Sequence, residues 1–247
     1  MQLFEPAGVL MTCVDGESAR ICAEYDRRDK EIPTEFYSWS APGNLLMYGQ
    51  SVRTCIAALK RRSMFPLNGL RIADIGCGFG GWLLEFIQWG ADPWRLAGVD
   101  LIPERIGQAR RRIPQADLRL GSAQKLPWTD ESFDLVSQFT VFTSILDPLL
   151  KQAIAEEMLR VLRPGGAILW FDFRIDNPTN SNVRGIRARE INALFAGCDM
   201  ELWPTVLAPP LSRLIAGRSW PFAEVLYSIP FLRTHYVGLI YKRQTRQ

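Results

Sequence analysis

Two kinds of apolar pattern alternate along the middle of the chain. The short β-rich runs RIADIG and RLAGVDL are each followed by a segment with apolar residues at helical spacing, GGWLLEFIQWG and PERIGQARRRI. A strand over 116–120, the run FDLVSQF, a helix over 149–162 and the run AILWFDF continue the series. Each helix must carry the chain back over the sheet, so the strands are parallel with right-handed crossovers. The pattern predicts an α/β fold with a Rossmann-like, doubly wound, mostly parallel sheet.

The two ends of the chain show a different pattern. Residues 1–68 lack strand alternation, and apolar positions from Leu45 to Leu59 fit one face of a helix, which Asn44 is predicted to cap. We therefore predict an N-terminal helical cap over 1–68 and a second domain over 69–247. Past residue 172 the chain predicts a short amphipathic helix in VRGIRAREINALF, a strand in MELWPTVLA and a last strand in THYVGLIYK. The proline-interrupted stretch 205–231 predicts a helical lid over the edge of the sheet where ligands bind.

Composition and charge exclude several classes of protein. Apolar residues make up 47% of 247, and 29 basic against 26 acidic residues leave a net charge of +3. That charge is too small to predict a nucleic-acid partner. Five scattered cysteines without a CxxC pair and one histidine predict that no metal is bound. The absence of a signal-like start and of a run of about eighteen apolar residues predicts a cytoplasmic protein without an integral membrane segment.

A glycine-rich turn follows the first predicted strand. The residues Asp74-Ile75-Gly76-Cys77-Gly78-Phe79-Gly80-Gly81 satisfy both GxGxxG and GxGxG. Either spacing allows a sharp turn that brings backbone amides to a ligand, and a plain structural turn is the alternative. Asp74 favours a cationic or amine-bearing ligand, because its carboxylate would repel a pyrophosphate.

Acidic and small polar residues follow the next two strands. Asp100 ends the second strand, where a carboxylate can accept hydrogen bonds from both ribose hydroxyls, although it could also cap the following helix. The loop from Gly121 to Trp128 follows the third strand and offers small residues to an adenine ring. The sequence therefore predicts a nucleoside site at the carboxyl edge of the sheet.

Four ordered blocks resemble the class I S-adenosylmethionine-dependent methyltransferases, close to the type 11 small-molecule group: ADIGCGFGGW, GVDL, LPWTDESFDLV and RVLRPGGAILWFDF. The resemblance implies S-adenosylmethionine as cofactor and seven strands with the last antiparallel. It implies that Asp74, Gly76 and Gly78 surround the methionine and ribose, that Asp100 holds the ribose hydroxyls, that Ala123 and Gln124 lie near adenine and that Gln138 lies near the sulfonium. Cys77, Gly80, Leu101 and Ser122 complete the cofactor set. The tail is similar to methyltransferases of bacterial glycan and secondary-metabolite clusters, which suggests a saccharide or similar small acceptor.

Two residues are candidate general bases. His235 begins the last strand, and if that strand is antiparallel its beginning lies on the ligand edge; the alternative is a structural histidine bonded to a loop carbonyl. Asp172 ends the fifth strand and could instead pair with Arg174, and Asp147 is a third candidate. A base is optional, because positioning acceptor and methyl group can supply about 7–11 kcal/mol of the acceleration.

Other charged and aromatic residues allow two readings each. Arg174, Arg184, Arg187, Arg213 and Arg233 form either an anion clamp for the acceptor or scattered surface pairs. Tyr37, Trp39 and Tyr48 either close over the ligands or pack in the core. The arginines at 110–112 are predicted to be structural, because they lie at the carboxyl end of a predicted helix, where the helix dipole favours positive charge.

These features predict a methyltransferase that acts on a small-molecule acceptor, at a hydroxyl of a saccharide or secondary metabolite. The alternatives are an NAD(P)-dependent oxidoreductase, disfavoured by Asp74 and by the lack of a YxxxK pair, and a non-catalytic cofactor-binding partner. RNA methylation is less favoured because no RNA-binding module is attached. The lid also suits a lipid-linked acceptor, and the sequence predicts neither the methylated atom nor the oligomeric state.

Overall fold

The computed structural model describes residues 16–178 and 180–242, and Cys13 lies outside them. The α-helices are α1 (Gly16–Glu31), α2 (Pro42–Arg61), α3 (Gly81–Gln88), α4 (Pro103–Arg112), α5 (Pro148–Val161), α6 (Ala188–Leu194), α7 (Pro209–Ile215) and α8 (Trp220–Tyr227). The strands are β1 (Ile72–Ile75), β2 (Leu96–Asp100), β3 (Asp117–Leu120), β4 (Phe133–Phe139), β5 (Leu162–Phe173), β6 (Cys198–Leu207) and β7 (Arg233–Lys242). Short 3-10 helices are η1 (Thr34–Tyr37), η2 (Pro93–Arg95), η3 (Phe142–Ser144) and η4 (Pro230–Leu232).

The strands form one seven-stranded sheet in the order β3-β2-β1-β4-β5-β7-β6. Neighbours from β3 to β5 pair in parallel, whereas β7 is antiparallel to both β5 and β6. This arrangement confirms the predicted Rossmann-like sheet with an antiparallel last strand. The strand order reverses between β1 and β4, and in open α/β sheets ligands bind outside the carboxyl ends of the strands at such a point.

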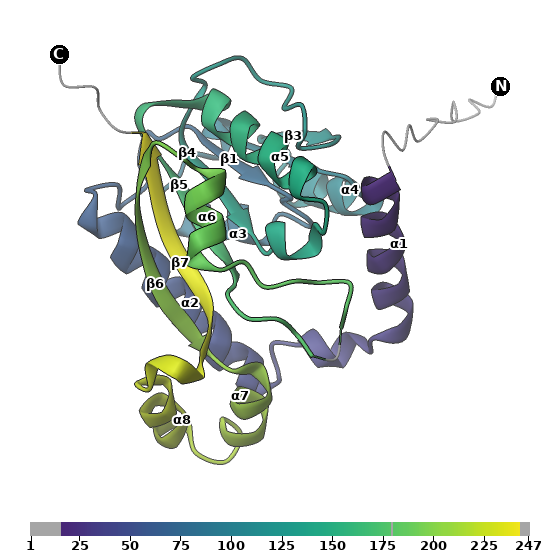
Figure 1. Ribbon diagram of the computed structural model, residues 1–247, viewed down its shortest axis with the longest axis vertical. Coiled ribbons are helices and arrows are strands. Elements are labelled where there is room, and N and C mark those ends of the chain that lie inside the picture. The colour runs from purple at the N-terminus through teal and green to yellow at the C-terminus, as the bar shows by residue number, and fades with distance from the viewer. Residues whose placement is uncertain (1–15, 179, 243–247) are drawn as a thin grey trace.

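Helices cover both faces of the sheet (Figure 1). One core joins the sheet to α5, α6 and α1 through Ile154, Ile191 and Ile21. The other joins it to α2, α3 and α4 through residues such as Leu59 and Phe86. Both faces of the central strands are therefore buried, which explains why their sequences are continuously apolar rather than alternating.

Helix α2 lies where the apolar spacing predicts a helix, but its start corrects the prediction. Ala41 is the N-cap and Pro42 occupies the first turn. The Asn44 side chain instead donates to the carbonyls of Phe36 and Ser38, at 2.8 and 3.0 Å. These two hydrogen bonds hold the η1 segment against the start of α2. The helix start does not need an asparagine cap, because Pro42 already sets the backbone there.

Helices α7 and α8 lie between β6 and β7 along the chain and pack on α2 through Leu46, Leu207, Ala216 and Ala223. Figure 1 shows them at the edge of the sheet where β5 and β6 end. The division at residue 68 and the role of 205–231 as a lid stay predictions.

Other chain-wide features concern thiols and membranes. Cys55 and Cys77 are buried free thiols. Across residues 16–178 and 180–242, no group of three or more metal-ligating side chains comes together. Within the same described residues, no helix combines the length and apolarity needed to span a bilayer.

Candidate active site

The glycine turn after β1 is shaped by left-handed backbone. Gly76, Gly78 and Gly80 have φ angles of +68°, +52° and +76°. At Gly76 a Cβ atom would also lie 2.5 Å from Cγ2 of Val141, in the loop after β4. Glycine is required there on both counts, and it lets the end of β1 approach the end of β4 at the point where the strand order reverses.

Asp100 joins this turn to the end of β2. Its carboxylate accepts the backbone N–H of Gly78 and of Ile102, both at 2.9 Å. Burial raises the pKa of Asp100 above its ordinary value, and the two amides partly offset that effect. A carboxylate offers about four acceptor positions, so Asp100 can still accept hydrogen bonds from two ligand hydroxyls.

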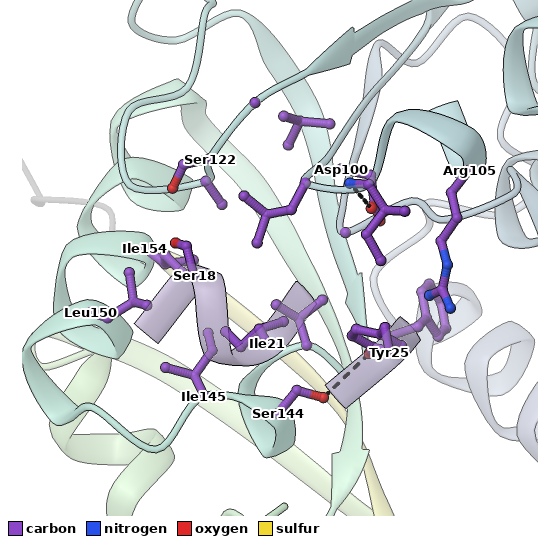
Figure 2. Close-up of a pocket in the computed structure, with 18 residues that line it drawn as sticks. Ser18, Ile21, Tyr25, Asp100, Arg105, Ser122, Ser144, Ile145, Leu150 and Ile154 are labelled. Atoms are coloured by element: carbon purple, nitrogen blue, oxygen red, sulfur yellow. Dashed lines mark hydrogen bonds between the residues drawn. The ribbon is translucent and has the colours of Figure 1, made fainter. Parts of the chain in front are cut away.

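A cavity lies between the glycine turn, the ends of β2 and β3, and helix α1 (Figure 2). Five predicted cofactor residues line it: Gly76, Asp100, Leu101, Ser122 and Ala123. Gly121, from the predicted adenine loop, also lines the cavity, and the lining residues that the sequence analysis missed are Ser18, Ile21, Tyr25, Val99, Ile102, Arg105, Phe139, Val141, Ser144, Ile145, Leu150 and Ile154. The wall is mainly apolar with a few polar groups, as expected for a nucleoside site.

Helix α1 forms the outer wall of the cavity. Figure 2 shows Ser18, Ile21 and Tyr25 on this helix beside the cavity. Arg20 donates to Glu17 at 2.8 Å and to the carbonyl of Ser144 at 2.6 Å. The Glu17 carboxylate also accepts hydrogen bonds from the backbone N–H groups of Leu146 and Asp147. These bonds tie α1 to the loop before α5.

The Glu17 carboxylate is held both by Arg20 on its own helix and by two backbone N–H groups of the loop before α5. Pairing with Arg20 lowers the pKa of Glu17 to about 2. The Tyr25 hydroxyl lies 3.3 Å from the Ser144 hydroxyl, one turn further along α1. We name the set Glu17, Arg20, Tyr25 and Ser144 the α1 clasp.

Arg105 connects α4 to both sides of the cavity. Its guanidinium lies over the rings of Tyr25 and Phe79, at 4.2 and 5.1 Å from their centroids. It also pairs with Asp29 at 3.3 Å. The sequence analysis missed Arg105 because it is one of several arginines in PERIGQARRR, and only the fold distinguishes it from the others.

Six predicted cofactor residues lie outside the described lining of the cavity: Asp74, Cys77, Gly78, Gly80, Gln124 and Gln138. Asp74 is buried and accepts a hydrogen bond from the Ser137 hydroxyl at 2.7 Å. Burial raises its pKa to about 7. The Gln138 amide donates to the Phe171 carbonyl at 3.3 Å and accepts from the Val141 N–H at 3.0 Å. These contacts make Asp74 and Gln138 supports of the loops behind the cavity, and their predicted roles toward a cofactor stay predictions.

His235 lies at the ligand edge, as the strand topology predicts. It pairs with Phe173 at the end of β5. Its ring packs on Phe171 and Phe173 at centroid distances of 5.0 and 3.8 Å, and the residue is only 5% exposed. Burial lowers the pKa of His235 to about 3, so the imidazole is neutral at physiological pH.

Asp172 is also enclosed. It is 1% exposed, and its carboxylate accepts the N–H groups of Thr143 at 3.1 Å and Phe173 at 2.9 Å. Burial raises its pKa to about 7. Arg174 does not form the expected pair and instead lies over the Tyr236 ring, 5.1 Å from its centroid. Asp147, the third candidate, caps α5 by accepting the Leu149 N–H.

The five arginines of the predicted anion clamp do not form one cluster. Arg213 lies over the Phe36 ring at 4.0 Å, and Arg233 donates to the Tyr227 carbonyl at 2.7 Å. Arg174 and Arg187 do share one cleft. The contacts of Arg213 and Arg233 therefore favour the alternative of scattered surface contacts over a single clamp built from all five.

An aromatic row runs from the N-terminal segment to the cavity. Trp39 packs edge-on against Tyr48, with 4.5 Å between centroids, and Tyr48 lies 5.9 Å from Trp82. Trp82 stacks on Phe139 at 3.8 Å, and Phe139 lines the cavity. Tyr37 packs on Phe36 and is half exposed. The row therefore continues the apolar wall of the cavity along the edge of the sheet.

Comparisons with known proteins agree with this geometry. Residues 72–166 match a protein family described as "Methyltransferase domain". A phthiotriol/phenolphthiotriol dimycocerosates methyltransferase of Mycobacterium leprae is 34% identical over 137 residues, which are 51% of this chain and 49% of that protein. The corresponding methyltransferase 1 of Mycobacterium ulcerans is 36% identical over 139 residues, with the same shares. The chain thus spans about half the length of the curated relatives it matches.

Solved structures share the fold. A putative sarcosine dimethylglycine methyltransferase from Galdieria sulphuraria superposes with a TM-score of 0.58 at 14% identity, covering 78% of this chain and 85% of that one. The [4+2]-cyclase SpnF gives 0.56 at 19% identity, covering 78% and 81%. The sheet order, the glycine turn and the Asp100 carboxylate are those expected from the resemblance to class I S-adenosylmethionine-dependent methyltransferases. The match to the methyltransferase domain family covers residues 72–166, the central part of the chain.

Proposed function

We propose that the protein transfers a methyl group from S-adenosylmethionine to a hydroxyl of a small, largely apolar acceptor of the secondary-metabolite or lipid type. The observation that carries the proposal is the cavity in which the glycine turn and the Asp100 carboxylate meet. The relatives' names support it, since phthiotriol is by its name a hydroxyl-bearing compound. A saccharide acceptor, suggested by the tail of the sequence, is the second candidate.

The residues of the cavity fit this cofactor. Asp100 has acceptor capacity for two ribose hydroxyls, and Leu101 and Ala123 offer an apolar wall to adenine. The Gly76 backbone can approach the methionine part closely because no Cβ is present. When bound, S-adenosylmethionine supplies an electrophilic methyl group on a positively charged sulfur.

The chain's own part is to bind, orient and exclude water. Helix α1 covers the outer side of the cavity and shields it from solvent. The aromatic row through Trp82 and Phe139 offers a flat apolar surface beside the cavity on which an acceptor can lie. Holding the acceptor oxygen in line with the methyl group would supply most of the acceleration, about 7–11 kcal/mol. The predicted lid role of 205–231 is part of this proposal.

The hydroxyl proton must leave as the new O–C bond forms, and Asp172 and His235 remain the proposed acceptors. They differ in pKa, which is about 7 for Asp172 and about 3 for His235. A base works only in its unprotonated form. With Asp172 as base, kcat/KM rises with pH and levels off above about pH 7. With His235 as base, the profile is flat from about pH 5 upward, so a pH–rate profile on wild type and the Asp172→Asn variant separates the two.

The first test is calorimetric titration with S-adenosylhomocysteine, with NAD as the second ligand. Wild type is expected to bind the sulfur nucleoside and not NAD. Asp100→Ala should weaken binding at least tenfold, because hydrogen bonds to a charged group contribute about 1.5–3 kcal/mol. Asp117→Ala is the matched control, since this carboxylate pairs with Arg119 at the start of β3, outside the cavity lining.

Each contrary result has a meaning. Binding of NAD alone would replace the proposal by the oxidoreductase alternative. Binding of the nucleoside without methyl transfer to any hydroxyl compound would support the non-catalytic alternative, since a shared fold does not fix function.

A further inference from the structure

Three arginines line one open cleft at the carboxyl edge of the sheet. Arg174 directly follows β5, whereas Arg187 and Arg189 stand at the start of α6. Tyr236 of β7 completes one wall, and the Asp176 carboxylate also lines the cleft. Residues far apart along the chain are thus brought together, and Figure 1 shows α6 alongside β7 and above the loop that follows β5.

Nearby carboxylates do not neutralise these arginines. Asp176 accepts the Gly185 N–H at 3.0 Å, Glu190 pairs with Lys151 at 2.7 Å, and Asp172 is held by two backbone amides. Among the ion pairs of residues 16–178 and 180–242, none includes Arg174, Arg187 or Arg189. Three guanidinium groups against one carboxylate leave the cleft with a net charge of +2.

Arg187 and Arg189 are exposed, and together with Arg174 they offer guanidinium N–H donors to an anion in the cleft. Arg174 is half buried and its guanidinium is held over the Tyr236 ring at 5.1 Å, which fixes its direction. Arg187 and Arg189 stand at the amino end of α6, where the helix dipole disfavours positive charge. Guanidinium groups bind carboxylate and phosphate oxygens through paired N–H donors, so an oxyanion would relieve the repulsion.

The position of the cleft relates it to the proposed reaction. Arg174 is separated from Asp172 by a single residue, and Tyr236 pairs with Asp172 across the sheet. The cleft and the cofactor cavity therefore open at the same edge of the sheet. We propose that Arg174, Arg187 and Arg189 bind an oxyanion, a phosphate or carboxylate group carried by the acceptor, and so anchor the acceptor for methyl transfer. This inference rests on the proposed function.

The test is an NMR titration of the protein, saturated with S-adenosylhomocysteine, with inorganic phosphate and separately with acetate. Saturable shifts of the arginine Nε–Hε signals are expected with a Kd of about a millimolar. The double variant Arg174→Gln/Arg187→Gln should bind at least tenfold more weakly. The anion that binds more tightly identifies the group as phosphate or carboxylate.

The chain offers a matched control at the opposite edge of the sheet. Arg61 and Arg62 line another open cleft, and Arg62 lies over the Tyr241 ring at 3.9 Å, as Arg174 lies over Tyr236. Arg61→Gln/Arg62→Gln should leave anion binding within twofold of wild type. Absence of saturable binding, or equal loss in both double variants, would overturn the inference. Nucleoside affinity, measured on the same variants, should not change, so a failure of the proposed function is seen separately.

Discussion

The carboxyl group of Asp74 is buried away from solvent. It is 2% exposed, its described hydrogen-bond donor is the Ser137 hydroxyl, and burial raises its pKa to about 7. The folded protein therefore holds a proton on Asp74 at pH values where the unfolded chain, with an ordinary value of 3.8, has released it. Stability falls as pH rises from about 4 to about 7, because the folded state binds more protons there than the unfolded state.

The Asp74→Asn variant should lose most of this pH dependence. Asparagine keeps an oxygen for Ser137 and carries no charge at any pH. Between pH 5 and pH 8, wild type should lose more free energy of unfolding than the variant, by up to about 2.7 kcal/mol, because about two pH units separate pH 5 from the raised pKa. Urea unfolding at the two pH values measures the difference. Identical pH dependence in both proteins would mean that Asp74 is ionised throughout.

At the scale of elements, the contact of α2 with α7 depends on one glycine. A Cβ atom at Gly43 would lie 2.7 Å from the Cα of Arg213 in α7, so the two helices approach through the missing side chain. Gly49, on the same helix, faces open space. Alanine substitutions at Gly43 and Gly49 therefore separate two effects on stability. Both change helix propensity, but only the one at Gly43 disturbs packing.

Gly43→Ala should destabilise the protein by about 1–3 kcal/mol, as expected for overpacking. Gly49→Ala should instead stabilise it by about 0.5–1 kcal/mol, because alanine favours the helix interior. Urea unfolding of both variants tests this. If both substitutions changed stability alike, the close approach of α7 to α2 would not be present in solution.

The elements also show where sequence reasoning succeeds and stops. Strands and helices of the central sheet are predictable because buried parallel strands are continuously apolar and crossover helices have a 3.6-residue period. Helix α1 lies inside the predicted helical cap over 1–68, but its position is not predictable: its sequence GESARICAEYDRRDKE is mostly polar, and only Ile21 and Tyr25 mark the face toward the cavity. Two such residues are too weak a signal, since the rest of that face meets a ligand cavity instead of a core.

The glycine turn shows the same limit within the site. Asp100, Gly76 and Ala123 were predicted and do line the cavity. At Gly80 a Cβ would contact Ala109 of α4 and Ile113, the residue that follows this helix, and Cys77 packs against Gly98. Gly80 and Cys77 of the glycine motif are thus explained by packing and backbone shape. The spacing of glycines in the sequence cannot distinguish such positions from positions that contact a ligand.

For the whole molecule, ligand binding should appear as added stability. A ligand that binds only the folded state stabilises it by about 2.7 kcal/mol at a concentration one hundred times its Kd. In a protein of this size each kcal/mol shifts Tm by about 2–4 °C. S-adenosylhomocysteine should therefore raise Tm by about 5–11 °C in a thermal melt, while NAD leaves it unchanged. No shift at a saturating concentration would contradict binding to the folded protein.

The α1 clasp has a consequence for turnover. Helix α1 walls the cavity, yet it is held by side chains such as Glu17 and Arg20 and not by strand pairing with the sheet. In the proposed reaction the spent nucleoside must leave before the next round begins, and undocking this helix would open the outer side of the cavity. Residence time on the protein is then set by how readily this helix undocks rather than by opening of the sheet. A substitution that weakens the contact would shorten that time while the chemistry at the sheet edge stays the same.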